Sequence, residues 1–422
     1  MTSLFPPLSN ETKRILNRLP ALIDKVFPMP GRFRGVLPRD VAELSRLLTA
    51  DRENRGASYL GRPALLSAYL RYFMPWNIYR LCRLLSTLPL NLKAGDVIND
   101  LGSGPLTFAA SLWISRPELR KVPLEFRCID RTPAIMDAGK KLFAALAAET
   151  IGDSNKSNGS NNSCPWTIKT IRGEIKRSGA LSVEIKGAPA ALTTAINVYN
   201  ELFWNLSPHD TEALVIFTNK SARLLSSLTD TSGAILLMEP GIPRSGEFIS
   251  LLRQCLIKEG RKPLSPCLHS GVCPMPGQST GRGTSRPNNS GAKTARAAKW
   301  CHFAFDTEDA PNALHKLSAA AGIPKERAVL SFLFAAPVTA QEKANELHRT
   351  TQERAKIRII SDSFSVGDIW GRYGCSERGL VLVNGSKRSL ENLPSGAQEE
   401  LHLSDDFTDA KSGAFIAEFG RH

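Results

Sequence analysis

The sequence predicts an α/β protein with a parallel sheet, a helical N-terminal layer and a small C-terminal β unit. Three patterns support this fold class: helical apolar spacing early in the chain, then strands alternating with helices around a glycine turn, and finally apolar–polar alternation between turn signals. A chain of 422 residues has room for a main domain with attached elements. We expect a helical region over 1–92, the main domain over 93–340, and the β unit with a tail over 341–422.

The N-terminal layer comes first. The stretch "SNETKRILNRLPALIDKVF" begins with Ser9 or Asn10 as a candidate helix cap, and "PRDVAELSRLLTADRENRG" repeats apolar residues at helical spacing. The N-terminus "MTSLFPPLSNETKRILNRLP" lacks the apolar core of a signal peptide and the acid-poor pattern of a transit peptide, and runs such as "GAILLM" are too short to span a bilayer. We therefore expect no membrane segment and a cytoplasmic protein, with the mitochondrial matrix as the alternative.

The main domain begins with "GDVINDLGSGPLTFAASLW", which predicts a strand, a glycine turn and a helix, and "LEFRCIDRTPAIMDAGKKLFAAL" predicts a second strand and helix. The turn contains Asp100, Gly102 and Gly104, and Asp130 ends the next strand, where a carboxylate can bind both hydroxyls of a ribose. The turn lacks the residues of a phosphate loop and the full dinucleotide motif, so a cofactor without phosphates is favoured.

Two more buried strands follow in "ALTTAINVYNELF" and "GAILLMEPG". Asn200 and Glu201 end the first of them at the ligand-binding edge of the sheet, so both are candidate pocket residues. The sequence offers no convincing catalytic residue. Two polar stretches, 152–163 and 277–299, interrupt the domain and are predicted to be disordered. The second has five basic residues and no acidic one, which favours RNA as its partner. The last stretch, 356–388, predicts a small antiparallel β unit.

Charge and cysteines indicate partners and metals. Lysine and arginine outnumber aspartate and glutamate by 54 to 40, a formal charge of +14, which suggests a polyanionic partner. Eight cysteines without a secretion signal are expected to be free thiols. Cys82, Cys128 and Cys255 fall in apolar patterns and are expected to be buried. Four others lie in turn-like or proline-flanked contexts: Cys267, Cys273, Cys301 and Cys375. Four thiolates suit either zinc or a 4Fe-4S cluster, and His269 or His302 can substitute for one of them.

The turn at "DLGSGPL" resembles motif I of the class I S-adenosylmethionine-dependent methyltransferases. The resemblance implies a Rossmann-like methyltransferase sheet, with Gly102, Gly104 and Asp130 as contacts of S-adenosylmethionine and with Asp100 and Asn200 as further candidates. The third glycine of the motif is replaced by Leu106, whose side chain is expected to crowd the cofactor.

Longer motifs are more specific. The stretches "PALLSAYLRYFMPWNIYRL", "MEPGIPRSGEFISLLRQCLI", "SPCLHSGVCPM" and "KWCHFAFD" resemble the methyltransferase-like family of mitochondrial small-ribosomal-subunit assembly factors and their bacterial relatives, over about residues 55–385. That resemblance implies a 4Fe-4S cluster bound by cysteines and docking on the ribosomal RNA of the small subunit. Cys267, Cys273 and Cys301 match the motif positions, Cys375 is assigned as the fourth ligand, and the insertion between Cys273 and Cys301 lengthens the usual spacing.

Three functions remain open from the sequence. The first is a factor for assembly or translation that binds rRNA of the small ribosomal subunit and carries the cluster. The second is an active rRNA methyltransferase that uses S-adenosylmethionine. The third is a zinc-containing methyltransferase of a small molecule, which leaves the basic stretch without a role. The oligomeric state is not predicted.

Overall fold

The structure is a computed structural model that describes residues 2–51, 59–155, 163–176, 178–204, 206, 210–275, 299–338, 354–403 and 407–420. Most of the polar insertion predicted at 152–163 lies outside these residues. The basic stretch predicted at 277–299 also lies outside them, except for Lys299.

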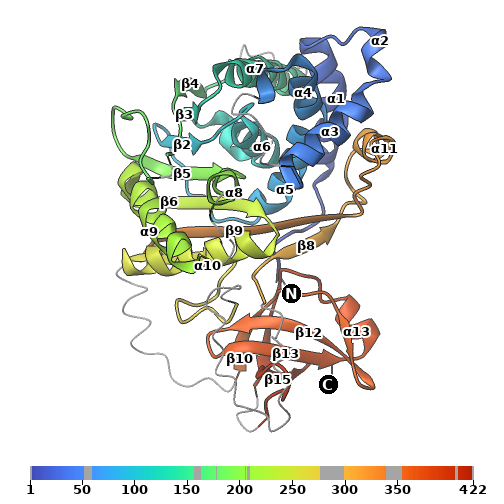
Figure 1. The fold of residues 1–422 in the computed structure, drawn as a ribbon, viewed down its shortest axis with the longest axis vertical. Coiled ribbons are helices and arrows are strands. Elements are labelled where there is room, and N and C mark those ends of the chain that lie inside the picture. The colour runs from blue at the N-terminus through green and yellow to red at the C-terminus, as the bar shows by residue number, and fades with distance from the viewer. Residues whose placement is uncertain are drawn as a thin grey trace.

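A mixed sheet forms the centre of the main domain (Figure 1). Its strands are β2 (Val97–Leu101), β3 (Glu125–Asp130), β4 (Thr167–Arg172), β5 (Ala190–Ile196), β6 (Thr229–Pro240), β7 (Arg261–Ser265), β8 (Phe303–Asp306) and β9 (Arg327–Pro337). The order is β4-β3-β2-β5-β6-β9-β7, with β8 paired to β9, and β9 runs antiparallel to its neighbours. This is the strand order of class I methyltransferases, so the predicted fold class is confirmed. The order reverses between β2 and β5, and ligands bind at such a switch point.

Helices cover both faces of the sheet (Figure 1). The helices on one face are α1 (Asn10–Val26), α3 (Leu37–Thr49), α4 (Pro63–Ala68), the π-helix η3 (Tyr69–Phe73), α5 (Met74–Leu85), α6 (Thr107–Ser115) and α7 (Pro133–Asn155). The helices on the other face are α8 (Tyr199–Phe203), α9 (Thr211–Leu228) and α10 (Pro243–Lys258). The short helix α2 (Gly31–Arg34) and α11 (Asn312–Ala320) complete this part. Alternation along β6 explains the two layers, because Leu236 and Met238 pack on the first face while Ile235 and Leu237 pack on the second.

The N-terminal helices form as the sequence predicts. Ser9 is the cap of α1, because its hydroxyl accepts the Thr12 N–H at 3.1 Å. The buried stripe of α1 includes Ile15, Leu19 and Ile23, at the spacing of one helix face. These residues join the same hydrophobic cluster as α5, α6 and the sheet, so the N-terminal layer shares the core of the main domain.

The C-terminal β unit has a separate core. It contains β10 (Arg354–Ile359), β11 (Phe364–Val366), β12 (Ile369–Ser376), β13 (Gly379–Gly385), α13 (Lys387–Glu391), β14 (Ala397–His402) and β15 (Phe415–Glu418), and β1 (Thr2–Ser3) joins the edge of β14. Its core includes Ile357, Val381 and Leu401. The predicted antiparallel pattern holds with one exception, because β13 and β15 run parallel. In the described part of the chain, no helix is long and apolar enough to cross a membrane.

Candidate functional site

The glycine turn after β2 packs closely against the loop after β5. Gly102 adopts a positive φ of 65°, and a Cβ atom there would lie 2.3 Å from Val198 Cγ2. Only glycine fits such a position without a clash. Gly104 also has a positive φ, of 51°, and its N–H donates to Asp130 Oδ2 at 3.0 Å. The glycine turn is thereby attached to the end of the next strand.

Asp130 lies at the carboxyl end of β3, as predicted. Its second oxygen, Oδ1, accepts the Thr132 N–H at 2.8 Å. Burial raises the pKa of Asp130, while the hydrogen bonds from Thr132 and Gly104 oppose that shift because they favour the carboxylate. Each oxygen keeps a further lone pair for an outside donor.

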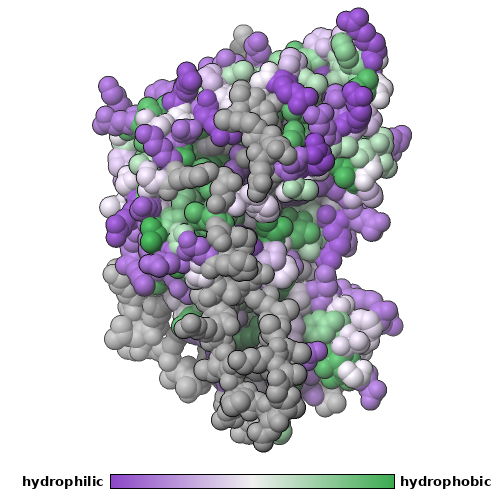
Figure 2. Space-filling model, in the orientation of Figure 1, coloured by the Kyte–Doolittle hydropathy of each residue, from purple (hydrophilic) through white to green (hydrophobic). Residues whose placement is uncertain are grey.

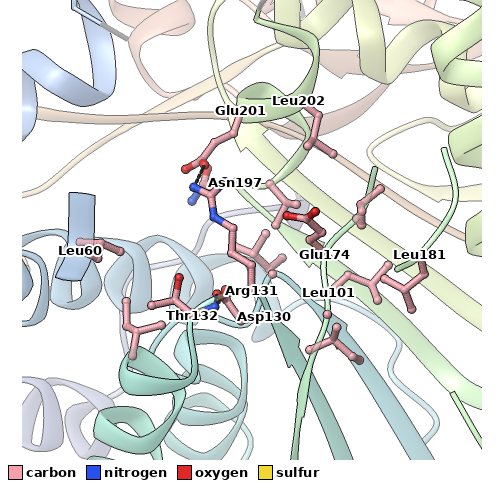
Figure 3. A pocket seen from close by; sticks show the side chains of 18 of the residues that line it. Leu60, Leu101, Asp130, Arg131, Thr132, Glu174, Leu181, Asn197, Glu201 and Leu202 are labelled. Atoms are coloured by element: carbon pink, nitrogen blue, oxygen red, sulfur yellow. Dashed lines mark hydrogen bonds and ion pairs between the residues drawn. The ribbon is translucent and has the colours of Figure 1, made fainter. Parts of the chain in front are cut away.

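A cavity of about 160 Å³ lies at this switch point (Figure 3). It is lined by Leu60, Tyr69, Leu101, Gly102, Gly104, Ile129, Asp130, Arg131, Thr132, Ile135, Gly173, Glu174, Ile175, Leu181, Ile196, Asn197, Val198, Glu201 and Leu202. Figure 3 shows the guanidinium of Arg131 reaching the carboxylate of Glu201 across the cavity, at 3.7 Å. Tyr69, from η3, brings the N-terminal layer to the cavity.

Three of the predicted cofactor contacts, Gly102, Gly104 and Asp130, line this cavity, whereas Asp100 and Asn200 do not. Asp100 is buried beneath the turn, where its Oδ1 accepts the Thr194 hydroxyl at 2.8 Å. Burial raises the pKa of Asp100 to about 7. Asn200 lies in α8, after β5 has ended at Ile196, so the expectation that it ends the strand is wrong.

Asn200 instead belongs to a buried cradle around Glu239, the last acidic residue of β6. Glu239 Oε1 accepts the N–H of Tyr199 at 2.8 Å and of Val198 at 3.2 Å, and Oε2 accepts the side-chain N–H of Asn200 at 2.8 Å. This carboxylate holds the loop that carries Val198 and Glu201 into the cavity. The sequence signal was an acidic residue ending the buried run "GAILLME", but its partners cannot be identified before the strands are paired.

Leu106 does not crowd the cavity, contrary to the sequence-based expectation. It adopts a left-handed conformation with φ 58° at the start of α6 and is fully buried. Its side chain packs against α7, where a Cβ on Gly139 would lie 2.8 Å from Leu106 Cγ. The missing side chain of Gly139 leaves the space that Leu106 fills.

The four cysteines predicted as ligands meet between the main domain and the β unit. Cys267 and Cys273 follow β7, Cys301 precedes β8, and Cys375 lies in β12. Each of the four is close enough to the other three for an electrostatic interaction between their thiolates. Burial raises the pKa of Cys301 and Cys375 above the usual thiol value. Cys82 and Cys128 are buried elsewhere, as predicted, while Cys255 is only half-buried.

Basic side chains surround this four-cysteine group. Arg253, from α10, donates its Nε–H to Cys267 Sγ at 3.2 Å and a second N–H to the His269 carbonyl at 2.6 Å. His269 Nε2 lies 3.3 Å from Cys375 Sγ. Arg358, from β10, donates to the Pro266 carbonyl at 3.1 Å and lies close enough to Cys267 to interact with its thiolate. Across the described ranges, no three histidine, cysteine or acidic side chains are arranged as ligands of one metal ion.

Comparison with known proteins identifies one family. Residues 214–363 match the family model described as "Mitochondrial small ribosomal subunit Rsm22". This region contains most of α9, all of α10 and the first three cysteines of the group. No curated protein matches the chain.

Solved structures with a similar fold are distant. They include a candidate sarcosine dimethylglycine methyltransferase from Galdieria sulphuraria (15% identity, 47% of this chain and 63% of that one, TM-score 0.24). A methyltransferase from Pyrococcus furiosus has 12% identity over 41% and 68% of the two chains, with a TM-score of 0.24. CalO1, a methyltransferase in calicheamicin biosynthesis, has 14% identity over 74% and 73%, with a TM-score of 0.29. Because these TM-scores are low, the fold is established by the strand order of the sheet and not by the similarity to these structures. Residues 214–363 are therefore similar to the family whose description names the mitochondrial small ribosomal subunit, and the main domain of the chain has the strand order of a class I methyltransferase fold.

Proposed function

We propose that the protein is an assembly or translation factor of the small ribosomal subunit that binds rRNA and carries a 4Fe-4S cluster on Cys267, Cys273, Cys301 and Cys375. One observation carries this proposal. Three segments that are distant in sequence bring these four thiols close enough to interact with one another. The family match supports the small-subunit partner.

The donor set suits a cluster chemically. Each thiolate of a 4Fe-4S cluster binds a different iron, so the thiolates need not approach one another as closely as four ligands of one zinc ion. Four thiolates bring four negative charges, and the guanidinium groups of Arg253 and Arg358 lie where they offset part of that charge. When bound, the cluster would supply a cross-link, with Cys375 tying the β unit to the loops of the main domain.

The charge of the chain supports an RNA partner. A formal charge of +14 favours binding to phosphates, and the basic stretch at 277–299 adds to it without an acidic residue. We also propose that the chain divides into a helical N-terminal region, a methyltransferase-like domain and a C-terminal β unit. The family description favours the mitochondrial matrix as the location, with the cytoplasm of a bacterial cell as the alternative.

Metal analysis of protein purified without oxygen tests the proposal. We expect about four irons per chain with visible charge-transfer absorbance. Cys273→Ser should lose iron, whereas Cys255→Ser, a half-buried thiol outside the group, should keep it. One zinc per chain and no absorbance would refute the cluster and favour a zinc site. Association with the small subunit is measured separately, by co-sedimentation of the purified protein with subunits.

A second candidate function is an active rRNA methyltransferase. The observation that favours it is the cavity at the switch point, lined by Gly102, Gly104 and Asp130. These residues would hold S-adenosylmethionine, with Asp130 accepting hydrogen bonds from the ribose. The cavity of about 160 Å³ is smaller than the roughly 300–1,000 Å³ of most ligand pockets, so Arg131 and Glu201 would have to separate first. Calorimetric titration with S-adenosylmethionine decides, because an enzyme must bind it.

A further inference from the structure

The strand connections of the C-terminal β unit follow a specific pattern. Its five main strands in chain order are β10, β12, β13, β14 and β15, and α13 lies between the third and the fourth. The first strand pairs antiparallel with the second and the fourth, the second with the third, and the third pairs parallel with the fifth. This is the connectivity of a five-stranded Greek-key barrel of the oligonucleotide-binding (OB) type.

We propose that residues 354–420 form an OB-fold whose ligand surface binds a single-stranded segment of RNA. This inference deepens the proposed function and rests on it for the choice of RNA as the nucleic acid. In OB-folds the ligand surface consists of the second and third strands together with the loops between strands one and two and between strands four and five. Here these are β12, β13, the segment 360–368 and, of the connection between β14 and β15, the described residues 407–414.

Exposed apolar side chains lie at this surface. Phe407, after β14, is 67% exposed, and Ile369, the first residue of β12, is 45% exposed. Phe364, in the segment 360–368, packs against Tyr373 of β12 with ring centroids 4.9 Å apart. Figure 2 shows hydrophobic surface among the atoms of the β unit near α13. Aromatic rings at a protein surface stack on the faces of unpaired bases, and one such contact is independent of base identity.

Cations lie over aromatic rings of the β unit. Lys299 Nζ lies 3.4 Å from the centroid of Tyr373, and Arg378 Cζ lies 4.8 Å from that of Phe415. A third pair joins Lys387 to Trp370 at 5.0 Å. Rings of this unit therefore take part in three cation–aromatic pairs, one of them with Lys299 of the main domain. Lysine and arginine beside aromatic rings are the combination that binds the backbone and bases of a single strand.

Charge alone does not select RNA, because residues 354–420 contain eight lysine and arginine residues and ten aspartate and glutamate residues. Binding of a single strand here would therefore depend more on base stacking than on contacts with phosphates. Of the two acidic residues in the segment 360–368, Asp362 is paired with the guanidinium of Arg327. The sequence that leads into Lys299, residues 277–298, contains four basic residues and no acidic one. The Lys299 side chain lies over the ring of Tyr373 in β12. A duplex hides its base faces, so stacking on these rings requires a single strand.

Fluorescence anisotropy of the full-length protein, purified without oxygen, tests this assignment with a labelled 12-nucleotide oligouridine and a duplex RNA of the same length. We expect tighter binding of the single strand. Phe407→Ala should weaken that binding about 5- to 150-fold, the range for the loss of one stacked base. Phe364→Ala should also weaken the binding of the single strand. The matched control is Phe33→Ala, because Phe33 is 48% exposed on α2, in the N-terminal layer, and it should leave the affinity unchanged.

Two results would overturn the assignment. One is equal affinity of Phe407→Ala, Phe364→Ala and wild type for the single strand, and the other is a preference for the duplex. If these variants keep RNA affinity but lose co-sedimentation with the small subunit, the surface docks a ribosomal protein and the RNA assignment fails while the proposed function stands. If wild type does not co-sediment with the subunit at all, the proposed function fails, whereas a single-strand affinity that depends on Phe407 would still support the OB surface.

Discussion

Asp309 is the centre of a buried polar network that holds the start of the chain against the main domain. Its Oδ1 accepts from the Arg83 guanidinium at 2.8 Å and from the Tyr79 hydroxyl, and its Oδ2 accepts the Leu8 N–H at 2.8 Å. The same guanidinium donates to the Phe5 carbonyl at 2.7 Å. The side chains of Arg83 and Asp309 are 9% and 14% exposed, so water contributes little to either charge.

We predict that Asp309→Asn lowers the free energy of unfolding by about 3–5 kcal/mol, because it leaves the Arg83 charge buried without its partner. That is a large part of the roughly 5–15 kcal/mol by which most domains are stable. The matched control is Asp306→Asn, three residues earlier. The Asp306 side chain is 77% exposed and its Arg327 partner is 4.0 Å away, so the loss there should be at most about 1 kcal/mol.

Urea unfolding at several pH values measures both variants. Burial by itself would raise the pKa of Asp309, but the hydrogen bonds from Leu8 and Tyr79, together with the Arg83 guanidinium, outweigh burial and lower the pKa in the folded state. The stabilisation is therefore present above the unfolded-state pKa of about 3.9 and is lost as the pH falls through the lower folded-state pKa. The difference between wild type and Asp309→Asn should shrink below about pH 4. A loss no larger than that of Asp306→Asn, or one that is constant down to pH 3, would refute the reasoning.

Three further predictions concern the main domain. Gly102→Ala should lower the melting temperature more than Gly367→Ala. Both glycines have a positive φ, but only a Cβ at Gly102 would lie 2.3 Å from Val198 Cγ2, so equal losses would contradict the proposed clash. Burial raises the pKa of Asp100 to about 7, so its stabilising contribution is fully present below pH 3.8 and is lost as the pH rises to about 7. Urea unfolding should therefore show that wild type loses about 3 kcal/mol relative to Asp100→Asn between pH 5 and pH 8, and an unchanged difference would contradict this. Phe248→Ala should cost about 3–5 kcal/mol in the same assay, because that ring is fully buried, and a loss under 1 kcal/mol would contradict this packing.

Local sequence patterns were sufficient to predict many of the residues in the two candidate sites. The glycine turn and Asp130 were found because a strand, a tight turn and a helix follow one another within a short stretch, and their geometry depends mainly on neighbouring residues. The four cysteines were singled out by the polar and proline-rich contexts around them. Asn200 was misjudged because β5 ends before it, and its amide then reaches a carboxylate 39 positions away.

The sequence by itself determined the class of fold, the helical layer, the family resemblance and the identity of the four thiols, because each depends on periodicity or on short motifs. Only the tertiary structure decided which groups meet. Packing of α6 on α7 buried Leu106 away from the cavity, and strand pairing brought Glu239 to the loop after β5 and placed Cys375 beside Cys267. The connectivity of the C-terminal β unit was also decided there, since the parallel pairing of β13 with β15 joins residues more than thirty positions apart and leaves no local pattern in the sequence.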